Sequence, residues 1–224
     1  MGKVLSSRWT KAAVFVLCLV PLGLIGYRVL VLAQTGYEPH LTANPIEYIT
    51  HFTGDWIMRF LLICLAITPL RKLGNQPKLA RYRRMFGLFA FAYSCVHFTT
   101  WFWFDKSFNV SDMWADIEKR RYITVGMAGF LMILPLAITS TAGWVRRMGF
   151  VKWQRLHRLI YFAALAGVIH YYWLVKSDVR LPLMYGAILG ILMLCRAAFW
   201  LEPAPQKSAA RPRATTPSTV TLRD

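Results

Sequence analysis

Long apolar runs alternate with short polar connections along most of the chain. Each run approaches the 20 or so residues that a helix needs to cross a hydrocarbon core of about 30 Å. The six predicted spanning segments are 12–33, 49–70, 85–104, 122–140, 156–175 and 181–201. We therefore predict an all-α integral membrane protein whose domain, residues 1–201, is a bundle of six transmembrane helices.

Composition supports this fold class and sets the last stretch apart. The chain has 224 residues, of which 56% are hydrophobic, and its mean hydropathy is +0.40. Such values are typical of membrane proteins. Residues 202–224 are instead rich in Pro, Ala, Ser and Thr with scattered bases. Such a segment has too little apolar surface to form a core, so we predict a disordered cytoplasmic tail.

The net charge of +17 is compatible with nucleic-acid binding, but its distribution favours a membrane topology. Lys and Arg cluster near the N-terminus, in the second connection and in the fourth, and these three segments contain no acid. The first connection, 34–48, has two acids and no Lys or Arg, and in the third, 104–121, four acids balance four bases. By the positive-inside rule both termini are predicted to be cytoplasmic, so the odd-numbered helices run outward.

Histidines inside two of these helices are the strongest functional signal. His97 lies 12 residues past Met85, where the third helix is predicted to begin, and His170 lies 13 residues past His157 in the fifth. Both helices run outward, so the two imidazoles are predicted at one depth, about 18 to 20 Å from the inner side. Such a pair suits the two axial positions of a heme iron. Two histidines hydrogen-bonded between helices are the structural alternative.

The other histidines give weaker signals. His157 lies near the basic end of the fifth helix and has no counterpart on the third, where Arg83 stands fourteen residues before His97. It is compatible with a second cofactor near the inner face or with an interfacial polar role. His51 lies where the second helix enters the bilayer and suits capping or interfacial contacts, with ligation as the alternative. His40 is interpreted as a solvated loop residue.

Several ordered motifs resemble one family. RRMFGLFAFAYSCVHFTTW, WQRLHRLIYFAALAGVIHYYW, NPIEYITHFTG and ITPLR are similar to the heme-binding membrane subunit of the bacterial protein-methionine-sulfoxide reductase system, within the ferric-reductase-like transmembrane group. The likeness covers about residues 10–200. On the family pattern His97, His157 and His170 match heme-associated histidines, and His51 matches the histidine of an HxTG-like stretch.

The resemblance implies a function as well as a fold. It implies six helices in the bacterial inner membrane, heme b, FMN and a non-catalytic role in electron transfer. Electrons from the quinone pool or a reduced flavin would pass to a periplasmic molybdopterin-containing catalytic subunit that repairs oxidised methionine in envelope proteins. His97 and His170 would hold the heme iron, with His157 as a further candidate ligand.

One departure separates the chain from the wider group. NADPH oxidases and ferric-chelate reductases resemble a four-histidine, two-heme arrangement followed by a soluble flavin and nicotinamide domain. Here one histidine is missing and the sequence has no GxGxxG. Two alternatives stay open: a ferric-type transmembrane reductase acting directly on an external acceptor, and a non-redox transporter or structural membrane subunit.

Overall fold

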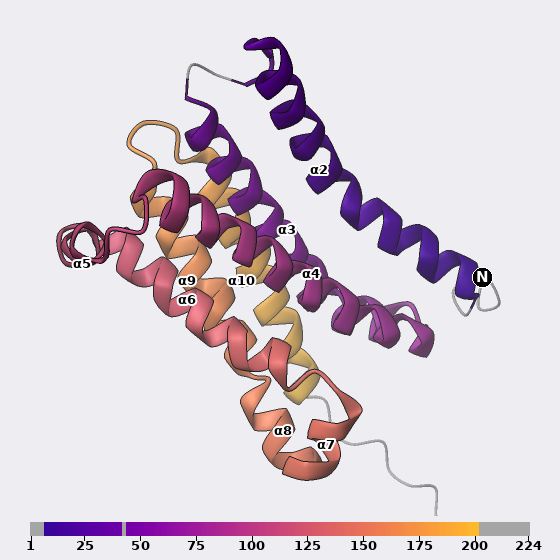
Figure 1. Ribbon diagram of the computed structural model, residues 1–224. Coiled ribbons are helices and arrows are strands. Elements are labelled where there is room, and N and C mark those ends of the chain that lie inside the picture. The colour runs from indigo at the N-terminus through magenta and orange to yellow at the C-terminus, as the bar shows by residue number, and fades with distance from the viewer. Residues whose placement is uncertain (1–6, 42–43, 202–224) are drawn as a thin grey trace, which may run out of the picture.

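The computed structural model describes residues 7–41 and 44–201, and all of their regular structure is helical (Figure 1). The elements are α2 Arg8–Thr35, α3 Pro45–Leu73, η1 Pro77–Leu79, α4 Ala80–Thr99, η2 Thr100–Asp105, α5 Val110–Lys119, α6 Arg121–Ile138, α7 Ala142–Met148, α8 Phe150–Leu156, α9 Leu159–Leu174 and α10 Arg180–Leu201. The all-helical prediction is confirmed. The predicted disordered tail, 202–224, lies outside the described residues.

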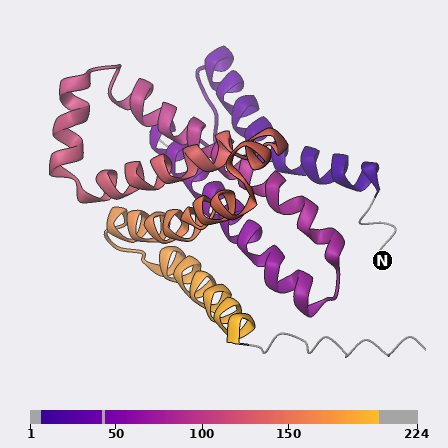
Figure 2. The ribbon, with the colours of Figure 1, turned by 90° about the horizontal axis from the view of Figure 1, so that it is seen from below.

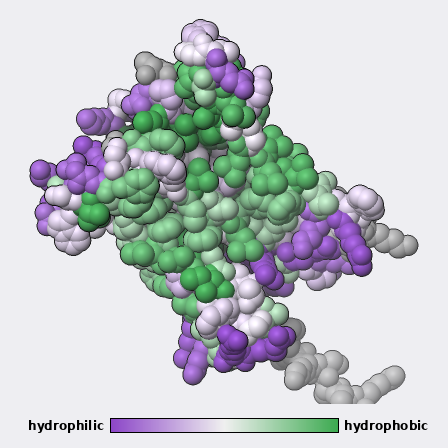
Figure 3. All heavy atoms as spheres, in the orientation of Figure 1, coloured by the Kyte–Doolittle hydropathy of each residue, from purple (hydrophilic) through white to green (hydrophobic). Residues whose placement is uncertain are grey.

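Among the described residues, five helices are long and apolar enough to cross a membrane. They correspond to five of the six predicted segments and comprise Arg8–Thr35, Pro45–Leu73, Pro77–Phe104, Arg121–Ile138 and Arg180–Phe199. The remaining segment, 156–175, contains α9, whose 16 residues extend about 24 Å. Hydrophobic residues cover the middle of the face in Figure 3, with hydrophilic residues toward its ends. The sixth span stays a prediction.

Local sequence explains where several helices begin and end. Asn44 caps α3 by accepting the backbone N–H of Glu47 at 3.2 Å, and Pro45 occupies the first helical position, where no N–H is needed. Gly36 ends α2 with a φ of 71°, a conformation that glycine adopts without a steric penalty. Asn109 and Thr141 cap α5 and α7 in the same way as Asn44.

Two helix pairs form most of the bundle (Figures 1 and 2). The helix α3 packs chiefly against α4, and α6 packs chiefly against α9, whereas contacts between the two pairs are fewer. The helix α10 covers α9 and α3, and α2 lies at the edge beside α4. We call the two ends of the bundle the α5 end, where α3 begins, and the α7 end, where α3 ends.

A buried hydroxyl joins α2 to the bundle. Pro21 has no N–H to donate within α2, and the side chain of Tyr93 from α4 reaches the backbone of this part of the helix. The Tyr93 hydroxyl donates to the carbonyl of Cys18 at 2.9 Å and accepts the N–H of Leu22 at 3.2 Å. Tyr93 is fully buried, so this contact fixes where α2 meets α4.

The sequence predicts one continuous helix through the stretch from Leu156 to Tyr172. The structure divides this stretch. The helix α8 ends at Leu156, His157 and Arg158 form a turn, and α9 begins at Leu159. The backbone N–H and the ring Nδ1 of His157 both bond the carbonyl of Trp153, at 3.0 Å each. His157 therefore lies outside α9, the helix that carries His170.

Candidate functional site

The structure brings two of the predicted site residues together. His97 near the end of α4 and His170 near the end of α9 face each other close to the α5 end, with ring centres 6.2 Å apart and ring planes at 85°. A metal between two imidazoles needs bonds of about 2 Å on each side plus roughly 1 Å from each nitrogen to its ring centre, hence centres about 6 Å apart. The separation matches that requirement.

His97 is held by α3. Its Nδ1 lies 3.0 Å from the backbone carbonyl of Thr50 and 3.3 Å from the hydroxyl of Thr53. A carbonyl oxygen only accepts hydrogen bonds, so Nδ1 carries the proton and Nε2 keeps a lone pair for a metal. The ring packs over Gly54, where an added Cβ would lie 3.3 Å from Cε1.

His170 is held by α6 in the same manner. Its Nδ1 donates to the carbonyl of Tyr122 at 2.6 Å, which again leaves the lone pair on Nε2. The close approach depends on Gly126, because a Cβ there would lie only 2.6 Å from Nδ1. Each histidine therefore bonds a carbonyl of the neighbouring helix and lies over the glycine four residues beyond it.

A cavity of about 560 Å³ surrounds the two rings. Its volume falls within the roughly 300–1,000 Å³ that is usual for small-molecule and cofactor sites. Apolar side chains of α3, α6 and α9 line its depth, including Met58, Leu61, Ile133 and Ala163. The geometry therefore offers a mainly apolar cavity that contains two neighbouring imidazole rings.

A bare metal ion does not suit this cavity. The described residues contain no group of three or more His, Cys, Asp or Glu side chains that could hold an ion. Zinc takes three or four protein ligands, whereas a heme iron takes four nitrogens from its macrocycle and needs only two from the protein. The donor set of His97 and His170 therefore fits heme.

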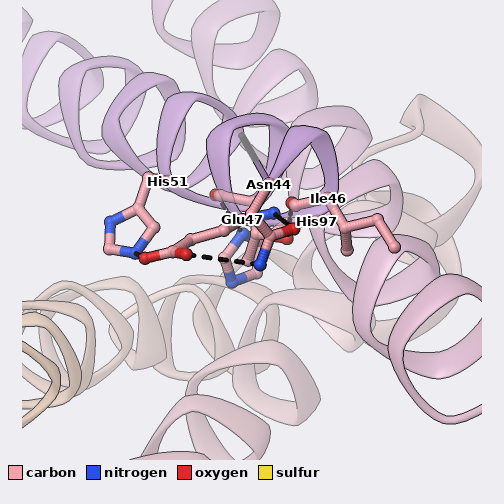
Figure 4. Close-up of polar contacts among 6 residues, drawn as sticks. Asn44, Ile46, Glu47, His51 and His97 are labelled. Atoms are coloured by element: carbon pink, nitrogen blue, oxygen red, sulfur yellow. Dashed lines mark hydrogen bonds and ion pairs between the residues drawn. The ribbon is translucent and has the colours of Figure 1, made fainter. Parts of the chain in front are cut away.

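The α5 end of the cavity is polar (Figure 4). Glu47 accepts a hydrogen bond from the amide of Asn44 at 3.3 Å, and its other oxygen lies 3.9 Å from Nε2 of His51. His51 is exposed and faces this pair (Figure 4), which agrees with the interfacial interpretation. Arg120 also lines this end of the cavity.

His157 lies apart from this pair, at the α7 end. Its ring stacks on Trp153 with centres 4.0 Å apart, and its Nε2 is buried without a hydrogen-bond partner among the described residues. Nearby, Arg196 of α10 bonds the carbonyl of Leu65 and the hydroxyl of Tyr161, both at 2.7 Å. The structure therefore separates His157 from the cavity between His97 and His170.

Sequence reasoning missed several residues that build the site. Gly54 and Gly126 lie where an imidazole approaches the backbone. Thr50 and Tyr122 bond the histidines through their backbone carbonyls, and a pattern of side chains does not reveal such contacts. Arg196 carried a readable signal, because a charged residue within an apolar run is functional by default.

Comparison with known proteins agrees with a heme site in a membrane protein. Residues 53–168 match the family model described as ferric reductase like transmembrane component. Three relatives carry the name protein-methionine-sulfoxide reductase heme-binding subunit MsrQ. The relative from Herminiimonas arsenicoxydans is 47% identical over 89% of each chain. Those from Caulobacter vibrioides and Xanthomonas campestris are 46% and 45% identical, over 82% and 93% of this chain and 84% and 94% of their own.

Proposed function

Because the chain belongs to the MsrQ family of heme-binding subunits of protein-methionine-sulfoxide reductase, we propose that it carries electrons through a membrane to a separate reductase. In this role the chain is a non-catalytic electron-transfer subunit. The observation that carries the proposal is the facing pair of His97 and His170, each with its Nδ1 on a backbone carbonyl.

Heme b would be held between these two histidines. The bound heme supplies one-electron redox chemistry, and the chain supplies its setting. The carbonyls of Thr50 and Tyr122 fix the tautomer and strengthen Nε2 as a donor. The apolar walls keep water from the macrocycle, and both features influence its reduction potential.

The proposed topology has six spanning helices in the bacterial inner membrane with both termini in the cytoplasm. The α7 end would face the cytoplasm, because the acid-free basic connections lie there. His97 and His170 lie toward the other end. Electrons would therefore leave on the periplasmic side.

The partners proposed here follow from the family. The acceptor is a periplasmic molybdopterin-containing catalytic subunit that reduces methionine sulfoxide in envelope proteins. The donor is the quinone pool or a reduced flavin delivered from the cytoplasm. FMN would bind as a second cofactor. Bases at the α7 end, among them Arg146 and Arg147, offer positive charges that suit its phosphate.

His157 is proposed as a heme-associated residue at the α7 end. Its buried Nε2 meets no acceptor or donor among the described residues, which is unusual for an imidazole. A bound cofactor would supply the missing partner. This site would be independent of His97 and His170.

Spectroscopy of the purified chain tests the central claim. We expect a reduced-minus-oxidised visible spectrum of low-spin heme b that disappears in His97→Ala and in His170→Ala. A chain that lacks the heme signal after expression with adequate heme supports a transporter or structural subunit instead. Activity toward an external acceptor without any periplasmic protein supports the ferric-type reductase.

A further inference from the structure

A charged pair lies halfway along α3. Arg59 is 14 residues from Pro45 and 14 from Leu73, so it lies about 21 Å from each end of the helix. Asp55 precedes it by four residues, a spacing that lets the two side chains pair on one face of the helix. Ionisable residues at this depth of a spanning segment are costly, and they are functional candidates by default.

The pair is loosely bonded. The nearest nitrogen of Arg59 lies 3.9 Å from the Asp55 carboxylate, beyond hydrogen-bonding distance. The other carboxylate oxygen accepts a long bond of 3.5 Å from the hydroxyl of Tyr185, a buried residue of α10. Well-formed hydrogen bonds are shorter than either of these contacts. A hydroxyl group placed beside the pair could therefore bond the carboxylate and the guanidinium together.

Aromatic rings surround the two charges. The guanidinium of Arg59 lies 4.8 Å from the ring centre of Trp56, and the rings of Tyr171 and Tyr185 are 6.2 Å apart. Tyr171, from α9, also interacts with the Asp55 carboxylate. We call Asp55, Arg59, Trp56, Tyr171 and Tyr185 the α3 polar cluster.

The α3 polar cluster connects the outside of the bundle with the cavity of the two histidines. The Arg59 side chain is 41% exposed, although it lies at the middle of the span. Asp55 and Tyr171 line the cavity, and they adjoin Gly54 and His170 in the sequence. A molecule bound at the cluster would therefore be reached from the lipid and would lie next to the cavity.

We propose that the α3 polar cluster binds the head group of a quinol. A quinol is a lipid-soluble aromatic ring that carries two hydroxyl groups. One of its hydroxyl groups can donate to the Asp55 carboxylate and accept from Arg59, and the Tyr185 hydroxyl can turn its proton from Asp55 to the same oxygen. The ring then packs among aromatic side chains. The proposal rests on the proposed function only for the quinol's role as electron donor.

Other ligands fit this position less well. The phosphate of a lipid headgroup or of a flavin belongs at the membrane surface, about 15 Å from the middle of the hydrocarbon core. An ion pair with a purely structural role would be expected to have short, well-aligned hydrogen bonds. The depth, the exposure of Arg59 and the long distances together favour a small, uncharged, hydrogen-bonding ring from the lipid.

Binding of decylubiquinol to the full chain in lipid nanodiscs, with heme and quinol both kept reduced under anaerobic conditions and measured by calorimetry, tests the site. We expect saturable binding of one molecule per chain. Both Arg59→Gln and Tyr185→Phe should weaken it about tenfold or more, because each removes a hydrogen bond to the ligand. Arg28→Gln is the matched control. Arg28 is another intramembrane arginine and bonds Tyr48, outside the cluster, so binding should change less than about twofold.

Each result bears on one proposal. Non-saturable uptake, or equal affinity in the wild type and in Tyr185→Phe, overturns the quinol site. Tyr185→Phe decides the question even if Arg59→Gln does not accumulate, because it removes a single hydroxyl. A chain that shows the heme spectrum but no binding contradicts only the quinol site. A chain that binds decylubiquinol but lacks heme contradicts only the proposed function.

Discussion

Replacing Gly126 with alanine should disturb His170 through one added methyl group. The new Cβ would lie 2.6 Å from Nδ1 and 2.9 Å from Cε1 of the imidazole. Non-bonded carbon atoms need about 3.5 Å, so the ring has to withdraw by roughly 1 Å. That movement breaks the bond to the Tyr122 carbonyl and displaces the ring from its position beside His97.

Absorption and EPR spectra of the heme-loaded chain measure the effect. Loss of a group that orients a metal-bound histidine weakens metal binding by roughly 10- to 100-fold. We therefore expect Gly126→Ala to lose most of its low-spin signal and to gain high-spin heme. Circular dichroism and size exclusion establish that the variant is folded.

Two further glycines provide a graded comparison. Gly54→Ala should have a smaller effect, because its Cβ would lie 3.3 Å from His97, a contact that a slight shift relieves. Gly190→Ala in α10 should have none, since no atom lies within 4 Å of the added group. A normal low-spin spectrum in Gly126→Ala, or a larger loss in Gly54→Ala, would refute the reasoning.

Three other substitutions probe separate parts of the chain. Tyr93→Phe should destabilise the protein by about 1–2 kcal/mol, because the Cys18 carbonyl and the Leu22 N–H lose their shared partner; unchanged thermal unfolding in detergent would contradict this. Arg196→Met should lower the unfolding temperature more than Tyr161→Phe, since it removes two hydrogen bonds rather than one. His157→Ala should keep the low-spin spectrum of the heme at His97 and His170; loss of that spectrum would place His157 in the same site.

The sequence predicted the architecture because the membrane imposes strict requirements on it. Apolar runs of spanning length identified five helices that are long and apolar enough to cross a membrane, and the comparisons confirm the family resemblance. Residue counting from the basic boundaries also placed His97 and His170 at one depth, and the structure brings them together.

Other features of the fold and of the site could not be predicted from hydropathy. The amphipathic helix α5 lies in a connection predicted as a loop, because its few apolar residues resemble a polar linker. The break at His157 is accompanied by a side-chain bond to the Trp153 carbonyl, a contact that hydropathy does not reveal. The roles of Gly54 and Gly126 depend on which helices become neighbours, and the sequence alone does not specify those contacts.

The scarcity of contacts between the α3–α4 pair and the α6–α9 pair has a consequence for how the protein matures. Each pair contributes one of the facing imidazoles, so a ligand that bridges them binds only the assembled state. Such a ligand adds about 4 kcal/mol of stability when its free concentration is 1,000 times its dissociation constant. Cellular heme supply would thereby govern how long newly inserted chains survive quality-control proteolysis, and heme starvation should deplete the protein itself as well as its activity.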